Sequence, residues 1–331
     1  MAKDIVTNNN KSEVFIVTGM GRSGTSLVAN FLQSAGIFIG DRVPEADSHN
    51  RYGYFEDLDF IHFHEKILAR HGLNYFASPK KPVILSDEEI NTAKELIRTR
   101  TNKPFWGWKD PRTCFFLDFW QNEIPNVNFI FLFRHPVEVF LSQLKSHTWT
   151  VPSEIFSSWV AYNERILQFY DQHPQKSILC NIHGLLQNID QFENRLHKKF
   201  GLTPGIFREL YHQDSIHCLF FPKSFEVFFS EKFSPVMQLY NRLQKKADVP
   251  FNRPTSISES NVVLLGKYLW DVFDTVVNTQ VEQHQQLQRA QQQLLLEYRV
   301  LSSKQYVKFG ITLENIIRKM FRKITKGKIK V

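Results

Sequence analysis

The segment with the clearest chemical potential is the glycine-rich stretch Gly19 to Ser26, Gly-Met-Gly-Arg-Ser-Gly-Thr-Ser. It follows the apolar run 14–17 and precedes an apolar-periodic stretch from Leu27 to Leu32, which predicts a strand, a tight loop and a helix. Such a loop gathers backbone N–H groups at a helix start, which carries about +0.5 of an elementary charge and favours an anion. The spacing nearly matches a Walker A loop, G-x-x-x-x-G-K-[ST]. Thr25 replaces the lysine of that motif, however, and the basic residue is Arg22, so we expect a phosphate-type anion other than an ordinary magnesium nucleoside triphosphate.

A second cationic position follows the apolar run 129–133, which predicts a buried strand. Arg134 comes directly after this run, and Pro136 suits the first turn of a helix. Ser142 lies eight residues beyond Arg134, about two turns into that helix. An arginine at a strand end with a hydroxyl nearby forms a second anion site. Two such sites on neighbouring strand ends predict a ligand with phosphates at two places.

In order and spacing, these motifs resemble those of bacterial-type sulfotransferases with a P-loop-like domain, which use 3′-phosphoadenylyl sulfate (PAPS). Arg22 to Ser26 is similar to the family's 5′-phosphosulfate loop, and Arg134 to Ser142 is similar to its 3′-phosphate site. Between them, the segments 53–56 and 106–112 resemble two further blocks of the family. The resemblance covers about residues 13 to 205. It implies transfer of a sulfuryl group from PAPS to a hydroxyl of a glycan, a lipid-linked or a small-molecule acceptor, with 3′,5′-adenosine bisphosphate as product.

The resemblance also implies roles for individual residues. The 5′-phosphosulfate would be bound by Gly21, Arg22, Ser23, Gly24, Thr25 and Ser26, and the 3′-phosphate, which distinguishes PAPS from ATP, by Arg134 and Ser142. Arg22 and Lys109 would act on the reacting group, with Lys109 neutralising charge that develops on the bridging oxygen. A sulfate ester carries less charge than the end of a triphosphate, so side chains and backbone N–H groups suffice and no metal is required.

The general base stays open among three carboxylates. Other branches of the family have a catalytic His two residues after the lysine, but here that position is Pro111. Glu56 is the first candidate, because glycan-modifying relatives use a Glu downstream of the phosphosulfate loop. Asp110 and Glu45 are alternatives, and Asp110 could instead form a structural pair with Arg112.

Three functions follow from these motifs. The first is a PAPS-dependent sulfotransferase. The second is a catalytically inactive relative that binds nucleotide and serves as an interaction module, and the third is an atypical P-loop kinase. The missing loop lysine counts against a kinase, as does Arg134 at a strand end where a Walker B strand supplies Asp.

The net charge of +8 is concentrated at the C-terminal end. Residues 304–331 contain nine Lys and Arg and one acid, whereas the first 303 residues contain 32 basic and 32 acidic side chains. This distribution disfavours nucleic acid as a partner. Within 304–331 the apolar residues follow the helical i, i+3, i+4, i+7 spacing and predict a basic amphipathic helix. Such a helix suits an anionic membrane surface, and packing on the chain's own body is the alternative.

The cysteines and the absence of long apolar runs indicate the compartment. Cys114, Cys180 and Cys218 are odd in number and lack C-x-x-C spacing, which is typical of reduced core thiols. No apolar run approaches the ~18 residues of a membrane-spanning helix, and residues 1–13 lack the apolar stretch of a secretion signal. We therefore expect a cytoplasmic protein. The basic tail adds the alternative that the protein contacts the inner face of the membrane peripherally.

Strands alternating with helices predict the fold class and the domain organisation. We expect strands at 14–18, 106–109, 127–133 and 178–182, with helices at 58–70, 87–100, 152–170 and 189–200. This alternation predicts an α/β fold like that of P-loop NTPases, with a mostly parallel sheet covered by helices on both faces and a C-terminal helical extension. The predicted parts are a flexible lead (1–12), a sulfotransferase α/β domain (13–225), peripheral helices or a linker (226–260), a long helix (261–303) and the basic tail (304–331).

Two features outside the motifs are also predicted. The long helix 261–303 is either a short coiled coil, through which the chain would self-associate, or a helix docked on the body. The acceptor pocket is expected from the loops between the motifs, at residues 40–55, 72–82 and 148–156, whose composition does not specify the acceptor.

Overall fold

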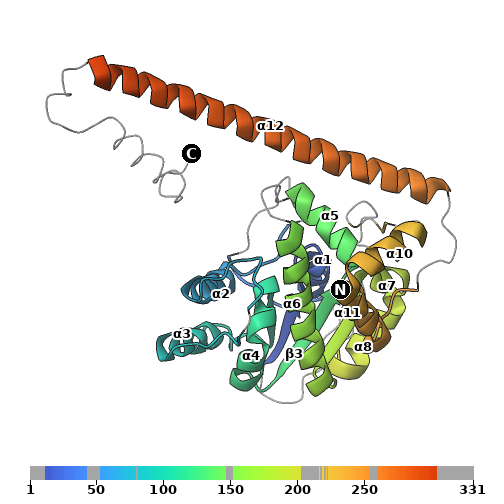
Figure 1. Cartoon of the computed structure of the whole chain (residues 1–331). Coiled ribbons are helices and arrows are strands. Elements are labelled where there is room, and N and C mark those ends of the chain that lie inside the picture. Colours follow the sequence, from blue (N-terminus) through green and yellow to red (C-terminus); the bar gives the residue numbers. More distant parts are fainter. Residues whose placement is uncertain are drawn as a thin grey trace. The chain divides into compact units, whose positions relative to one another are not determined.

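The structure is a computed structural model of the whole chain (Figure 1), and it describes residues 12–42, 53–79, 81–146, 152–202, 216, 218, 219, 221, 223–252 and 259–303. The chain forms two compact units, Met1–Leu269 and Trp270–Val331. The first unit contains the sheet and the predicted anion motifs. The boundary between the units falls inside the long C-terminal helix.

A four-stranded parallel sheet with the order β2-β1-β3-β4 forms the centre of the first unit. The strands are β1 Glu13–Thr18, β2 Phe105–Lys109, β3 Val127–Phe133 and β4 Ser177–Asn181. β1 and β3, which precede the two anion motifs, are neighbours, and Thr18 lies opposite Phe131. Because the strands are parallel, their carboxyl ends and the segments that follow them emerge at one edge of the sheet, where ligands bind in open α/β sheets.

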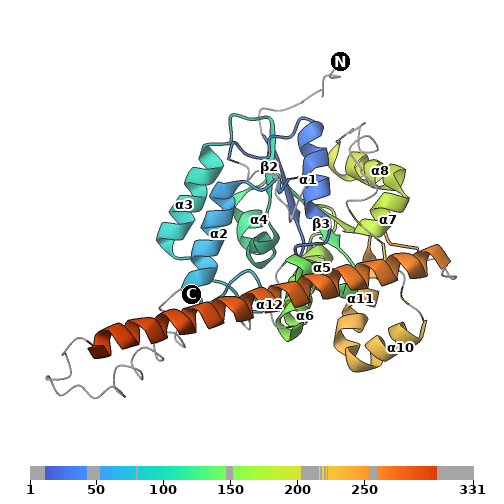
Figure 2. The same ribbon diagram turned by 90° about the horizontal axis from the view of Figure 1, so that it is seen from above.

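Helices make up most of the rest of the described chain. In chain order they are α1 Thr25–Ser34, α2 Leu58–Arg70, α3 Asp87–Arg98, the 3-10 helix η1 Pro111–Phe116, α4 Leu117–Glu123, α5 Pro136–Ser146, α6 Pro152–Gln172, α7 Ile182–Gln187, α8 Ile189–Phe200, α10 Lys223–Lys232, α11 Ser234–Lys246 and α12 Glu259–Ser303. α2 and α3 lie side by side near the β2 edge of the sheet, and α7 and α8 lie near the β4 edge (Figure 2).

The central strand β3 is buried along its whole length because helices cover both faces of the sheet. The ring centroid of Phe129 lies 4.8 Å from that of Phe169 on α6. The next residue, Ile130, belongs to the core cluster on the opposite face, together with Phe31 of α1 and Phe192 of α8. Alternate side chains therefore serve two cores, as expected for a strand buried on both faces. The predicted fold class is confirmed.

The tryptophans of β2 belong to the core. Trp106 and Trp108 are fully buried, and the ring of Phe60 on α2 stacks on Trp108 with centroids 3.9 Å apart. This packing fixes α2 against the edge strand of the sheet. It also fixes the end of β2, from which Lys109 emerges.

One junction differs from the sequence prediction. We expected a strand over 178–182, but β4 ends at Asn181 and α7 begins at Ile182. The side-chain oxygen of Asn181 accepts hydrogen bonds from the backbone N–H groups of His183 at 2.9 Å and Gly184 at 3.4 Å. This side-chain cap starts a helix where the apolar run continues, because the cap satisfies the first backbone donors of the helix.

The C-terminal helical extension is the single helix α12. In its part beyond residue 269, large apolar side chains are exposed at helical spacing; they are Trp270, Phe273, Val277, Val281, Leu287, Leu295 and Leu296. The predicted lead (1–11 of it) and the basic tail 304–331 lie outside the described residues.

Candidate active site

The glycine-rich loop joins β1 to α1 through two residues in the left-handed region. Arg22 has a φ of 72° and Gly24 a φ of 88°. A side chain makes this conformation unfavourable by roughly 1 kcal/mol, so the surroundings hold the backbone of Arg22 in place. Gly24 is the N-cap of α1 and has no side chain that could cap the helix. No side-chain cap therefore competes with an anion for the first N–H groups of α1.

Ser23 adds a buried hydroxyl to this loop. Its side chain is fully buried, and Oγ has no hydrogen-bond partner among the described residues. Burying an unsatisfied hydroxyl costs about 1–3 kcal/mol, and a phosphate or sulfate oxygen at this place would remove that cost. The loop, its helix start and this hydroxyl fit a phosphosulfate-type anion. The other predicted loop residues are Gly21, which precedes Arg22, and Thr25 and Ser26, which form the first turn of α1.

Arg22 brings the two predicted anion motifs together. Its Nε donates to Ser142 Oγ on α5 at 2.9 Å, and its backbone carbonyl accepts from Arg134 Nη1 at 3.3 Å. Burial lowers the pKa of Arg22, and the positive charge of Arg134 lowers it further. Arg22 is half-buried and Arg134 is buried. Two guanidinium groups this close together favour an anion beside them.

Glu138 of α5 lies behind Arg134 and is almost completely buried. Its Oε2 accepts from Arg134 Nε at 3.1 Å and is 2.8 Å from Nε2 of His183, while its Oε1 accepts from the backbone N–H of Leu219 at 2.6 Å. Burial alone would raise the pKa of Glu138, but the charges of His183 and Arg134 lower it below its usual range. Sequence reasoning missed this carboxylate, although its position four residues after Arg134 on a helix was a usable signal.

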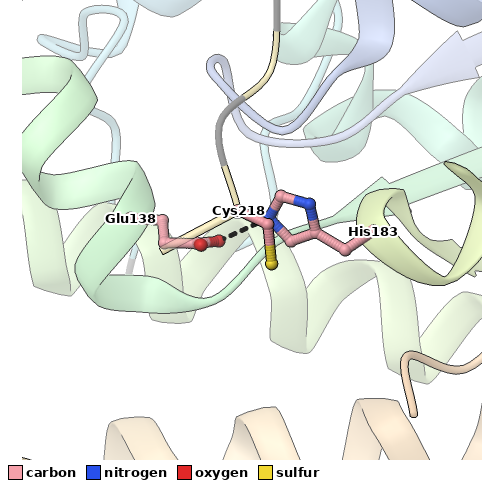
Figure 3. Close-up of side chains that lie close together, drawn as sticks. All are labelled: Glu138, His183 and Cys218. Carbon is pink, nitrogen blue, oxygen red and sulfur yellow. Dashed lines mark hydrogen bonds and ion pairs between the residues drawn. The ribbon is translucent and has the colours of Figure 1, made fainter. Parts of the chain in front are cut away.

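The half-buried Cys218 lies beside this pair. Figure 3 shows Glu138 and His183 pointing toward each other with Cys218 beside the imidazole, and one potential ligand atom of each lies within 4.8 Å of the others. Both oxygens of Glu138 already accept hydrogen bonds from protein groups. We therefore interpret the cluster as the support of Arg134. Cys114, Cys180 and Cys218 form no disulfide bonds.

Lys109 and Glu56 meet at the end of β2. Lys109 Nζ donates to Glu56 Oε1 in an ion pair whose side chains are 3% and 14% exposed. Phe55, the residue before Glu56, has a φ of 51°, so its backbone too is held in the left-handed region. The segment before α2 thus turns sharply and places the Glu56 carboxylate beside Lys109, the last residue of β2. The pair brings together a group that can take a proton and a group that can neutralise negative charge.

Asp110, the alternative base, is fully engaged in hydrogen bonds. Its Oδ1 accepts from the backbone N–H and from Nη1 of Arg112, at 3.0 and 2.9 Å. Its Oδ2 lies 2.7 Å from Nδ1 of His64. Burial raises the pKa of Asp110, but Arg112 and His64 outweigh burial and lower it to about 2.

The hydrogen bond from Trp120 determines the tautomer of His64. Nε1 of Trp120 donates to Nε2 of His64 at 3.0 Å, so Nδ1 carries the proton and donates to Asp110. Burial lowers the pKa of His64, which keeps the imidazole neutral. His64 thus acts as a structural donor within an aromatic core, and no signal in the sequence pointed to this contact. The third candidate base, Glu45, lies outside the described residues.

Comparison with known proteins identifies the family of this chain. The model of the sulfotransferase family matches residues 14–183. Among solved structures, the sulfotransferase domain of the Synechococcus PCC 7002 olefin synthase is 16% identical, with a TM-score of 0.41 over 81% of this chain and 98% of that one. The sulfotransferase domain of the curacin biosynthetic pathway is 15% identical (TM-score 0.40, 77% and 96% covered), and STF1 of Mycobacterium tuberculosis is 12% identical (0.38, 71% and 77%). No curated protein sequence matches significantly. The match to the family model covers half of the chain and spans both anion motifs, and the chain therefore belongs to the sulfotransferase family.

Proposed function

We propose that the protein transfers a sulfuryl group from PAPS to a hydroxyl group of an acceptor. The observation that carries the proposal is the contact of Arg22 with both Ser142 and Arg134. These residues come from two motifs more than a hundred positions apart, and they meet at the carboxyl ends of two neighbouring parallel strands. One nucleotide with a 5′-phosphosulfate and a 3′-phosphate matches such a pair of cationic positions.

The nucleotide is held by the chain's own donors. The loop residues 21–26 hold the 5′-phosphosulfate through backbone N–H groups, the Ser23 hydroxyl and the Arg22 guanidinium. Arg134 and Ser142 hold the 3′-phosphate. PAPS supplies an activated sulfuryl group whose leaving group is a phosphate. Because Arg22 and Lys109 supply positive charge, the proposal includes no metal ion.

Glu56 and Lys109 have separate roles in the transfer. Glu56 takes the proton of the acceptor hydroxyl as its oxygen bonds to sulfur. The bond between sulfur and the bridging oxygen breaks, and its electron pair stays on the 5′-phosphate of the bisphosphate, where Lys109 stabilises the charge. Asp110 is less suited as base because a carboxylate with a pKa of about 2 is a weak proton acceptor. We therefore place Glu56 first.

Nucleotide titration tests the proposal. The purified full-length protein is titrated with 3′,5′-adenosine bisphosphate and, in parallel, with ATP and Mg²⁺. Preference for the bisphosphate supports the proposal, and preference for ATP supports the alternative of an atypical kinase. Transfer of radiolabel from the donor to a cell extract then separates an enzyme from a catalytically inactive relative, because only the enzyme labels an acceptor. A carbohydrate or lipid-linked acceptor would appear in this assay as a labelled glycan or lipid.

A membrane contact through residues 304–331 is a separate proposal. No helix in the described part of the chain is long and apolar enough to cross a bilayer. The basic and apolar pattern of 304–331 supports peripheral binding to anionic lipid at the inner face of the membrane. Co-sedimentation with anionic vesicles, with and without these residues, tests it, and equal binding of both proteins would reject it.

Self-association through 261–303 is proposed on the exposed apolar side chains of α12. Leu287 and Leu295 are 47% and 56% exposed. Burial of such side chains between two copies would remove apolar surface from water. Sedimentation velocity of the full chain and of the Leu287→Asp variant tests this, since an unchanged sedimentation coefficient would contradict it.

A further inference from the structure

The hydroxyl of Tyr75 lies against the anion loop at Gly21. Tyr75 belongs to the segment between α2 and α3, one of the three predicted acceptor loops. A Cβ atom built on Gly21 would stand 1.6 Å from the Tyr75 hydroxyl oxygen, so the phenol occupies the space that any side chain at Gly21 would fill. The backbone of Gly21 is outside the left-handed region, and space for this phenol is therefore the reason why a glycine is needed there.

Three elements hold Tyr75 in this place. The hydroxyl of Tyr162 on α6 donates to the backbone carbonyl of Tyr75 at 2.8 Å. The guanidinium carbon of Arg112 on η1 lies 5.2 Å from the centroid of the Tyr75 ring, within the range of a cation–π contact. The side chain of Gln143 on α5 hydrogen-bonds with the Tyr75 phenol, and its Nε2 donates to the Gly21 carbonyl at 3.4 Å. These contacts hold the half-buried Tyr75 beside Gly21.

The phenol of Tyr75 is close enough to both groups of charged residues in the site to interact with them. Arg22 of the anion loop and Glu56 of the Lys109 pair both interact electrostatically with its phenol. Burial raises the pKa of Tyr75, and the phenol therefore keeps its proton at neutral pH. A protonated phenol beside Gly21 can donate a hydrogen bond to a group bound at the anion loop.

We propose that Tyr75 is a catalytic residue whose phenol donates a hydrogen bond to an oxygen of the sulfuryl group during transfer. This inference rests on the proposed function. The phenol keeps its proton throughout, while the acceptor proton goes to Glu56 and the electron pair of the broken sulfur–oxygen bond goes to the bisphosphate. Donors fixed before the reaction stabilise charge on the transferred group without reorganisation, which is the usual source of the largest catalytic effects.

The test uses the Tyr75→Phe variant of the full-length protein, with Tyr170→Phe as matched control. Tyr170 also donates its hydroxyl to a partner, Asp248 at 2.9 Å, which is none of the site residues described above. We expect Tyr75→Phe to lower the transfer rate from radiolabelled PAPS about 10²-fold. The Kd for 3′,5′-adenosine bisphosphate should change less than about twofold, because the bisphosphate lacks the sulfuryl group. Tyr170→Phe should match the wild type in both.

Other outcomes overturn the inference. A wild-type transfer rate in Tyr75→Phe rejects a catalytic role, and a parallel loss of rate and of bisphosphate binding assigns Tyr75 a structural role instead. If Tyr75→Phe does not fold by circular dichroism, Tyr162→Phe replaces it. That variant keeps the phenol but removes a bond that positions it, and it should lower the rate several-fold at unchanged bisphosphate affinity; an unchanged rate would reject the inference. The proposed function fails differently, since the wild-type protein would then bind no bisphosphate or prefer ATP.

Discussion

The two halves of the candidate site differ in the balance of positive and negative side chains. In the nucleotide half, formed by Arg22, Arg134 and Ser142, two guanidinium groups lie together: Arg22 donates to the hydroxyl of Ser142, and Arg134 donates to the Arg22 carbonyl and pairs with the carboxylate of Glu138. In the acceptor half, formed by Glu56 and Lys109, the cation faces a carboxylate directly. The first half thus places two guanidinium groups beside one carboxylate and favours an anion, whereas the second pairs one cation with one carboxylate.

This difference implies a division of labour. Substitutions in the nucleotide half should change nucleotide affinity, because they alter the field that attracts phosphate. Substitutions in the acceptor half should change the rate at constant nucleotide affinity, because they alter a group that acts only when bonds change. A single substitution that changes both nucleotide affinity and transfer rate would contradict this separation of roles.

The largest effect is expected for Glu56→Gln. The amide cannot accept the acceptor proton, so kcat should fall about 10²-fold or more, while the Kd for the bisphosphate stays within about twofold. Transfer of radiolabel and calorimetric titration measure the two quantities. Glu65→Gln is the matched control: Glu65 pairs with Arg112 at 2.5 Å and is half exposed, and its loss should leave kcat near the wild-type value. Full activity of Glu56→Gln would exclude Glu56 as base.

Arg134→Ala should act on binding. Loss of a charge-assisted hydrogen bond to the 3′-phosphate is worth about 1.5–3 kcal/mol, so bisphosphate binding should weaken about 10- to 10²-fold. Adenosine 5′-phosphate lacks the 3′-phosphate, and its Kd should change much less. The ratio of the two Kd values measures the effect. Arg165→Ala, which removes a surface ion pair with Asp118, serves as control. Equal weakening for both nucleotides would contradict a 3′-phosphate role for Arg134.

Asp110→Asn separates a structural carboxylate from a catalytic one. The pKa of Asp110 is depressed from 3.8 to about 2 in the folded state, so its charge stabilises the fold above pH 4, and this stabilisation is lost as the pH falls from about 4 toward 2. The shift corresponds to about 2 kcal/mol at neutral pH. Urea unfolding should therefore show that the wild type has a larger free energy of unfolding than the variant. This difference should be constant from pH 7 to 5 and become smaller below pH 4. If the difference in unfolding free energy does not change with pH, Arg112 and His64 do not lower the pKa of Asp110.

The sequence predicts those parts of the site that lie close together along the chain. The loop 19–26 and the segment from Arg134 to Ser142 are contiguous motifs. The periodicity of the apolar residues beside each motif predicts the strand before it and the helix after it. Glu56, Lys109 and the pair of Asp110 with Arg112 were each named from the sequence. That Glu56 pairs with Lys109 could not be predicted, because the contact joins residues 53 positions apart and depends on the left-handed turn at Phe55.

The contacts that no motif marks depend on packing. His64 reaches Asp110 only because α2 stacks on the tryptophans of β2, and Tyr75 reaches Gly21 only because Tyr162 and Arg112 hold its segment from other elements. Neither histidine nor tyrosine stands in a recognisable pattern. The start of α7 was missed for a local reason, since the capping side chain of Asn181 outweighs the continuing apolar run.

Glu138→Gln gives the smallest expected effect and the sharpest test of the nucleotide half. If Glu138 only orients Arg134, its loss leaves the guanidinium in place but less fixed, and the preference for bisphosphate over adenosine 5′-phosphate should fall about fivefold, less than in Arg134→Ala. The amide has a single oxygen and can accept from Arg134 or from the Leu219 N–H but not from both, so circular dichroism checks that the variant folds. His183→Asn removes the other side of the pair and should act in the same direction. In a double-mutant cycle, Glu138→Gln should have no further effect on nucleotide preference once Arg134 is Ala. An additive effect would mean that Glu138 acts on the nucleotide independently of Arg134. The interpretation of Glu138 as a residue that only orients Arg134 would then be wrong.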